Sequence, residues 1–247
     1  ALEHLSVAAA MVRFPVFIAG GRAPSLGDGL RFEDGSLRGV LIPTEPFEER
    51  VVHLYRDGVK VEAVAGSFPV PAAAHLDDEF TLDASHAGVV RDERLARAFE
   101  AGRSRVADLL MREAAKQAER SRDPNLTPSR LAHSSSWLRH VAAGRLTNYA
   151  ADAKTPALKA LWETPLFVGV TGRPLSLRAL EVQMSRIGCV PVCDPVLGMP
   201  AVRMLGLEPS VEVVWWLDAW DQCLRAIFGD KLKDWGTLDH LWHRLRG

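Results

Sequence analysis

The sequence predicts an α+β protein of two small domains, a mixed sheet with hairpins and a long helix first, then a helix-rich α/β domain. Three observations support this prediction. Asp34-Gly35 and Asp57-Gly58 each lie between alternating apolar residues, which is typical of tight β-hairpins. A long amphipathic helical pattern follows over 92–120. Six of the seven tryptophans lie after residue 160, which indicates a separate core in the second half.

The composition narrows the class of protein. The 247 residues suit one or two domains, and 47% hydrophobic with 25% charged residues is ordinary for a globular protein. A net charge of −1 gives no electrostatic reason to expect a nucleic-acid or membrane partner. No apolar run approaches the roughly 18 residues that span a bilayer. Three cysteines suit a reducing compartment, so we expect a cytoplasmic location.

The N-terminal domain is expected to cover residues 1–122. It begins with a helical pattern over 1–13, which ends before Pro15 because a residue that precedes proline avoids the helical region. The two Asp-Gly hairpins follow, and short extended pieces over 68–84 continue the sheet. One helix is predicted from Asp92 to about Arg120, with Leu and Phe on one face and Arg and Glu on the other.

The C-terminal domain is expected to cover residues 123–247. The stretch "SRDPNLTPSRLAHSSS", residues 121–136, has two prolines and several serines and is predicted to be the linker. The linker is followed by helical segments, the strand-turn stretch "PLFVGVTGRPLSL", a helix that Ser176 could cap, the strand "CVPVCDP" and a tryptophan-rich helical end.

Three groups of side chains could in principle bind a metal ion, and we predict a structural role for each. Cysteine spacing does not match a four-ligand zinc site, which favours buried cysteines at Cys189, Cys193 and Cys223. The acidic run at 77–79 is expected in a solvated turn. Two imidazoles alone are weak evidence for a metal site, so a polar helix face is favoured for Asp239, His240 and His243. No metal site is predicted.

Four stretches carry a family resemblance. They are "ALEHLSVAAAMVRFPVFIAGGRAP", "GSLRGVLIP" followed by "VVHLYRDGVKVE", "FTLDASHAGVVRDERLARAFEAGRSRVADLL" and, in the second half, "ALWETPLFVGVTGRPLSLRAL". Together they resemble the middle, or transducer, segment of bacterial GHKL-type ATPases and the region downstream of it. The similarity is greatest to the ninety-kilodalton heat-shock chaperone family and touches about half of the chain.

The resemblance implies a βαβ transducer domain with a loop that reaches the γ-phosphate of ATP in a preceding domain. A cation at that place would stabilise the charge on the transferring phosphoryl group. In the chaperones an arginine directly follows the loop serine, whereas here His86 follows Ser85 and the nearest arginine is Arg91. The resemblance therefore makes Arg91 and His86 the catalytic candidates and Ser85 the nucleotide-binding candidate.

The chain lacks the Glu-then-Asn helix and the Gly-rich lid with which GHKL ATPases hold magnesium and ATP. We therefore expect no cofactor and no enzymatic activity for this chain alone. ATP and magnesium would enter with an N-terminal ATPase domain, in the same or another chain. The expected function is to relay the nucleotide state of that domain to a protein client or partner, and a homodimer is compatible with this role.

Two other functions remain open at this point. A self-contained small-molecule enzyme could have its site between the two domains, formed by His53, His75, His86 and Asp83. A purely structural interaction module would instead expose several tryptophans. We expect core positions rather than a partner surface for Trp215, Trp216, Trp220 and Trp235.

Overall fold

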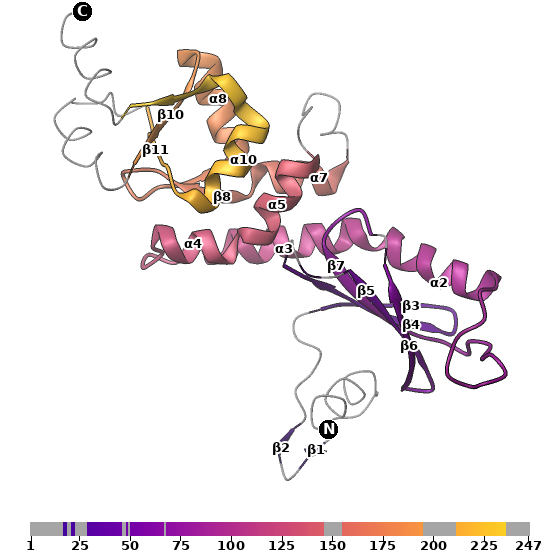
Figure 1. The fold of residues 1–247 in the computed structure, drawn as a ribbon. Helices are drawn as coiled ribbons and strands as arrows, with labels where there is room; N and C mark the ends of the chain where they lie inside the picture. Colours follow the sequence, from indigo (N-terminus) through magenta and orange to yellow (C-terminus); the bar gives the residue numbers. More distant parts are fainter. Residues whose placement is uncertain are drawn as a thin grey trace, which may run out of the picture. The chain divides into compact units, whose positions relative to one another are not determined.

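A computed structural model describes residues 29–45, 48, 50–66, 68–145, 155–194 and 211–235, together with the short strands β1 (Phe17–Ile18) and β2 (Gly21–Arg22) (Figure 1). The predicted helix over 1–13 and the residues Asp239, His240 and His243 lie outside this part of the chain. The α+β class is confirmed, with a mixed sheet in the N-terminal part and helices in the C-terminal part.

The chain divides into two compact units, residues 1–109 and 110–247. The boundary falls between Leu109 and Leu110, inside a helix, and therefore precedes the position near 122 that the sequence suggests. The predicted linker is also partly wrong, because the helix α4 (Pro128–Ser134) forms within it. Thr127 caps this helix and Pro128 occupies its first position, so the proline that suggested a linker begins a helix instead.

The first unit contains one five-stranded sheet. Its strands lie in the order β3-β4-β7-β5-β6, and all neighbours are antiparallel except β5 and β7. The bounds are β3 (Leu30–Asp34), β4 (Leu37–Pro43), β5 (Val51–Arg56), β6 (Val59–Ala65) and β7 (Ala72–Asp77). Both Asp-Gly hairpins are confirmed, since Gly35, Asp57 and Gly58 have the positive φ angles of tight turns.

The βαβ arrangement implied by the resemblance is not found among the described strands of this unit. No helix separates β3, β4, β5, β6 and β7, and the helices follow the last strand. The chain connects the parallel strands β5 and β7 through β6. The short Asp57-Gly58 turn makes β6 antiparallel to β5, and the chain then passes to the other side of β5, where β7 pairs with it in parallel.

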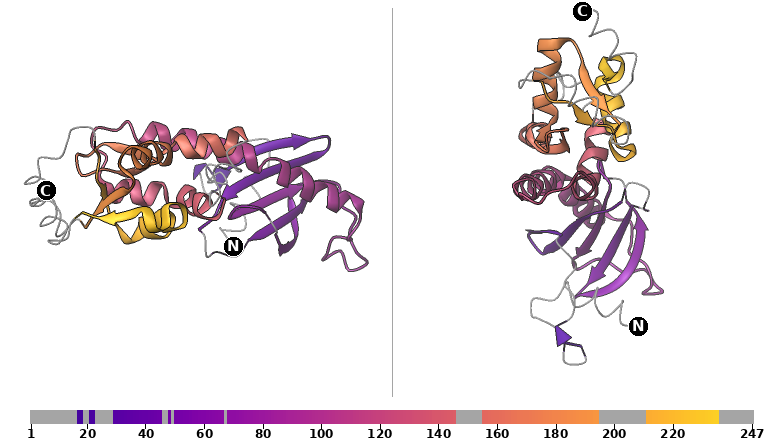
Figure 2. Two further views of the ribbon diagram at one scale, coloured as in Figure 1. Left: turned by 90° about the horizontal axis from the view of Figure 1, so that it is seen from above. Right: turned by 90° about the vertical axis from the view of Figure 1, so that its left-hand side faces the viewer.

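The helix α2 (Glu93–Ser104) covers one face of this sheet (Figure 1, Figure 2). The covered face is fully buried at Leu41, Val52, Leu54, Ala74 and Leu76. The helix contributes Leu95 and Ala98 to the same core. Asp92 begins the helix, since its side chain accepts a hydrogen bond from the Leu95 N–H at 3.0 Å.

The single helix predicted over 92–120 is in fact two. The helix α2 ends at Ser104, and α3 (Val106–Arg120) begins after Arg105. Two local features explain the break. Gly102 packs against the Phe68 ring, and the Ser104 hydroxyl donates to the Ala101 carbonyl at 2.7 Å. Glycine and serine in one turn are a common cause of helix kinks.

The second unit combines helices with a small parallel sheet of order β11-β10-β12 and the antiparallel pair β8-β9. Ser176 caps α8 as predicted. The further elements are α5 (Ser136–Arg145), α7 (Pro156–Glu163), β8 (Pro165–Val168), β9 (Pro174–Ser176), α8 (Leu177–Ile187), β10 (Val190–Cys193), β11 (Val214–Trp215), α10 (Asp218–Phe228), the 3-10 turn η1 (Gly229–Lys231) and β12 (Leu232–Asp234).

The tryptophans of the second unit lie mainly in its core, as expected. Trp215, Trp220 and Trp235 are buried, and the Trp220 ring meets Phe167 edge-on with centroids 5.6 Å apart. Trp216 is half-buried and donates to Asp221 at 2.9 Å. These four tryptophans therefore serve mainly to fill the core. Within the described part of the chain, the helices are all too short or too polar to cross a membrane.

Candidate functional site

The segment from Thr81 to Arg91, here called the hairpin loop, carries the residues that the family resemblance selects. It leaves the sheet after β7 and returns to the start of α2. Its arms pair as a small antiparallel ladder, with a bridge between Leu82 and Val89 and a hydrogen bond from the Val90 N–H to the Thr81 carbonyl at 2.8 Å. The loop is therefore an ordered projection.

Asp83 organises the tip of the hairpin loop. Its carboxylate accepts hydrogen bonds from the Ser85 hydroxyl at 2.6 Å and the Ser85 N–H at 3.0 Å. The Asp83 carbonyl accepts from the His86 N–H at 3.0 Å, which closes a turn. The Ser85 hydroxyl and backbone N–H hold the pKa of the Asp83 carboxyl below its usual value, so the carboxylate stays ionised at neutral pH.

The turn requires unusual backbone geometry at two positions. His86 has a φ of 57°, a left-handed conformation that a non-glycine residue adopts rarely. A Cβ atom on Gly88 would lie 2.8 Å from the Asp83 carboxylate, so only glycine fits there without movement of that side chain. The side chains of Ser85 and His86 are exposed at the resulting tip.

The base of the hairpin loop is tied to the edge of the sheet. Glu62 on β6 accepts hydrogen bonds from the Val89 N–H at 2.8 Å and from the Arg91 guanidinium at 3.0 Å. Arg91 also donates to the Val89 carbonyl at 3.0 Å. These contacts lower the pKa of Glu62, chiefly through the Arg91 hydrogen bond, and raise that of Arg91. We call this arrangement the Glu62–Arg91 latch.

The three predicted site residues therefore lie in one loop but in different settings. Ser85 and His86 occupy its tip, whereas Arg91 lies at its base in an ion pair. Glu62 is a residue of this site that no sequence motif predicts, and it lies 29 positions before Arg91. The only signal for it was an acidic residue in the apolar alternation "VKVEAVA".

The histidines considered for a small-molecule enzyme are only partly brought together. His53 and His75 stack with ring centroids 4.7 Å apart on the sheet face opposite α2. The Tyr55 hydroxyl lies 2.9 Å from His75 Nδ1. Among the described residues, no hydrogen bond or ring contact joins this histidine pair to Asp83 or His86 of the hairpin loop.

Burial governs the electrostatics of this histidine pair. It lowers the pKa of His75 to about 4, with smaller contributions from His53 and Lys60, and it also lowers the pKa of His53. It raises the pKa of Tyr55, and Asp77 adds to that rise. The tyrosine hydroxyl thus stays protonated and shares a hydrogen bond with a neutral imidazole, an arrangement suited to a packed sheet face.

The groups tested for metal binding have other roles in the described residues. Cys193 and Cys223 are buried and Cys189 is half-buried, and no cluster of three or more potential ligands occurs in the described ranges. The expectation of a solvated turn at 77–79 is wrong for Asp77. This side chain is 1% exposed, is paired with Arg38, and accepts from the Gly58 N–H at 3.2 Å.

Comparisons with known proteins add no relative. No protein-family model matches the chain, and no curated protein matches it.

Proposed function

We propose that this chain is the non-catalytic coupling and partner-binding region of a chaperone-like GHKL ATPase of the bacterial cytoplasm. In this role it relays the nucleotide state of a separate ATP-binding domain to a protein partner. The observation that carries the proposal is the hairpin loop, an ordered projection with Ser85 and His86 exposed at its tip and Arg91 at its base.

At the tip, the exposed His86 imidazole could donate a hydrogen bond to an anionic ligand supplied by another domain. The Ser85 hydroxyl donates to Asp83 and accepts from the Ala87 N–H at 3.3 Å, which fixes its position. The His86 imidazole is exposed beside it. The Asp83 carboxylate accepts the Ser85 hydroxyl hydrogen bond, but its lowered pKa makes it a weak base, so the loop contributes positioning groups rather than an activated nucleophile.

The base of the loop provides a physical route for relay. The ion pair between Glu62 and Arg91 is partly exposed, at 22% for Glu62 and 58% for Arg91, and ion pairs at the surface contribute only about 0.2–1 kcal/mol. A phosphate group near Arg91 could therefore compete with Glu62 for the guanidinium. Asp92 follows directly and caps α2, so a change in the latch reaches the first turn of that helix within one residue.

The first arm of the test uses the chain alone. Its melting temperature is measured with and without magnesium and a non-hydrolysable ATP analogue, and we expect no change. A clear stabilisation would show that the chain binds nucleotide by itself, which would contradict the proposed division of labour.

The second arm uses the complete gene product that contains this chain. If it carries a GHKL domain, we expect His86→Ala and Arg91→Ala to lower ATP turnover, while ATP affinity changes little. The control is Arg97→Ala, an exposed arginine on α2 outside the hairpin loop. Absence of such a domain, or turnover equal to the control in both variants, would refute the proposal.

A further inference from the structure

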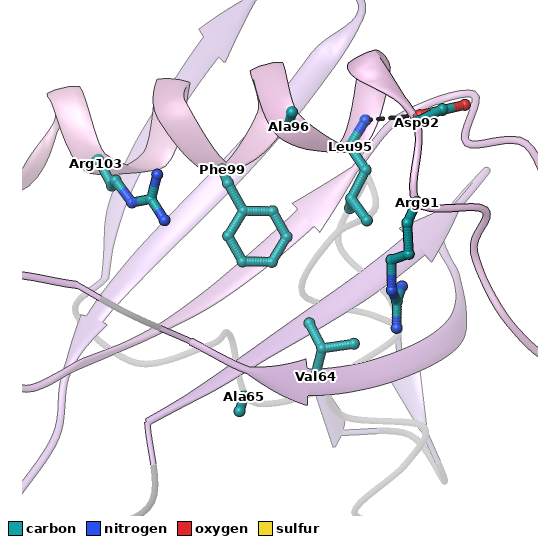
Figure 3. Close-up of a pocket in the computed structure, with 8 residues that line it drawn as sticks. All are labelled: Val64, Ala65, Arg91, Asp92, Leu95, Ala96, Phe99 and Arg103. Atoms are coloured by element: carbon teal, nitrogen blue, oxygen red, sulfur yellow. Dashed lines mark hydrogen bonds between the residues drawn. The ribbon is translucent and has the colours of Figure 1, made fainter.

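A groove lies between the strand β6 and the helix α2 in the first unit (Figure 3). Its volume is about 430 Å³, within the range of about 300–1,000 Å³ that is common for ligand sites. Val64 points from β6 toward the helix, and Leu95 and Phe99 point from α2 toward the strand. Arg91 and Arg103 lie at the two ends, with Asp92 beside Arg91, so an apolar centre separates the two arginines.

The strand that borders this groove is at the edge of the sheet. Among the described strands β6 pairs with β5 and with no other. At the end of this pair the Gly66 N–H donates to the Arg50 carbonyl at 2.7 Å. Hydrogen-bonded positions alternate along an antiparallel strand, so the backbone groups of Val64 face β5 and those of Ala63 and Ala65 face outward. This edge can accept one more strand.

We propose that the groove binds an extended segment of a partner protein, added to the sheet as a strand beside β6. Addition of a peptide strand to a sheet edge uses backbone hydrogen bonds for affinity and side-chain pockets for specificity. An apolar side chain of the peptide would lie among Val64, Leu95 and Phe99. Acidic side chains on either side of it would meet Arg91 and Arg103.

Charge and shape together favour this occupant. Arg103 is 43% exposed and lies 3.4 Å from Glu100, a helical ion pair of the surface kind that contributes about 0.2–1 kcal/mol. The opposite edge of the sheet is β3. The cavity near it is lined mainly by polar groups, including Asp34, Ser36 and Asp78. The apolar centre thus distinguishes the β6 edge.

This inference goes beyond the proposed function and needs no nucleotide. The hairpin loop would sense an anion in another domain, whereas the groove would recognise a peptide. The variants below leave Ser85, His86 and Arg91 unchanged, so failure of the groove proposal and failure of the relay proposal are distinguishable.

The probe is a fluorescein-labelled peptide of alternating Ile and Thr with Asp and Glu at both ends, titrated with the full chain and read by fluorescence anisotropy. The control peptide carries Lys at both ends. We expect saturable binding of the acidic peptide and binding of the Lys peptide weaker by about tenfold or more. Methylation of the backbone nitrogens on one edge of the acidic peptide should abolish binding, because strand addition uses those groups.

Two variants test the geometry. Arg103→Glu should lower the affinity for the acidic peptide by about tenfold and raise the affinity for the Lys peptide. Arg97→Glu on the same helix should change neither affinity. Ala65→Pro removes an outward N–H and should abolish binding, while Ala65→Ser keeps the N–H and should preserve it. Far-UV circular dichroism and the melting temperature of each variant establish that the fold is intact.

Equal affinity for both peptides, no binding of either, or an intact Arg103→Glu variant that behaves as the native chain would overturn the proposal. A second copy of the chain is the other occupant that an open edge could take. If the native chain sediments as a dimer and Ala65→Pro sediments as a monomer, the edge serves self-association. This result would contradict the proposal that a partner peptide binds there.

Discussion

The histidine pair on the sheet face opposite α2 predicts a specific loss of stability in acid. His75 is 5% exposed, and burial lowers its pKa from 6.5 in an unfolded chain to about 4. Above pH 6.5 the imidazole is neutral in both states, so its contribution to stability is complete. As the pH falls from 6.5 toward 4, His75 binds a proton in the unfolded chain but not in the folded chain. Stability is lost across this window.

The expected magnitude follows from the two pKa values. The interval between 6.5 and about 4, at about 1.4 kcal/mol per pH unit, corresponds to about 3 kcal/mol in the free energy of unfolding. The neighbouring groups act in the same direction. The His53 ring stacks on His75, and the positive charges of His53 and the Lys60 ammonium both oppose protonation of His75.

The variant that tests this reasoning is His75→Asn, which keeps a polar atom for the Tyr55 hydroxyl and cannot titrate. The control is His86→Asn, which removes an exposed imidazole from the same unit. The chain is equilibrated in urea at several pH values between 7.5 and 4. Each sample is then labelled by a short deuterium pulse at one fixed pH, so that the labelling chemistry is the same in all samples. Peptides from β5 and β7 report on the first unit alone, because the chain has two units and need not unfold in one step.

We expect the native chain and His86→Asn to lose stability as the pH falls, and His75→Asn to lose about 3 kcal/mol less over the same range. The comparison concerns the slope, so a constant cost of the Asn side chain does not affect it. If His75→Asn keeps the full slope, or if the loss occurs mainly above pH 6.5, then His75 is not the group responsible.

Three further predictions concern single positions. Arg139 is 4% exposed and donates to the carbonyls of Ala132 and Ala219, at 2.7 and 3.1 Å. Arg139→Ala should therefore destabilise the second unit by about 3 kcal/mol in urea unfolding, against less than about 0.5 kcal/mol for the exposed control Arg97→Ala in the first unit; equal effects would contradict the buried role. Gly88→Ala should displace Asp83 and increase amide hydrogen exchange over 84–87, whereas Gly144→Ala, where nothing lies within 4 Å, should raise the melting temperature slightly because alanine favours a helix by up to about 1 kcal/mol. Glu62→Gln should speed exchange of the Val89 amide, and this difference should shrink at high salt if the latch is ionic; an unchanged difference would argue for a neutral hydrogen bond.

The local elements of the fold were predictable because their causes are local. Asp57-Gly58 adopts the positive φ angles that any tight hairpin needs, and Ser176 caps α8 through a neighbour three residues away. The position of β7 between β4 and β5 was not predictable in this way. It depends on pairing between strands far apart in the sequence, for which a single sequence carries no signal.

The candidate site also has one part that local sequence predicts and another that depends on contacts between distant residues. The hairpin loop could be located from sequence, since Ser85, His86 and Arg91 lie within seven consecutive residues of a recognisable pattern. The ionic partner of Arg91 could not, because Glu62 reaches it only through the register of β6 at the sheet edge. The groove likewise requires Val64 and Phe99 to face each other, which needs the helix placed over the strand.

Arg91 belongs to both proposed sites, so binding at one site should change the affinity of the other. Arg91 forms the latch at the base of the hairpin loop and also one end of the groove. If an anion bound at the hairpin loop draws the guanidinium away from Glu62, the acidic peptide in the groove loses or gains the same partner. Linkage then requires that the peptide change the affinity for the anion by the same factor as the anion changes the affinity for the peptide. Arg91→Lys keeps the charge but not the paired donors, so it should reduce this coupling while both ligands still bind. Equal coupling in Arg91→Lys and the native chain would show that the two sites communicate by another route or not at all.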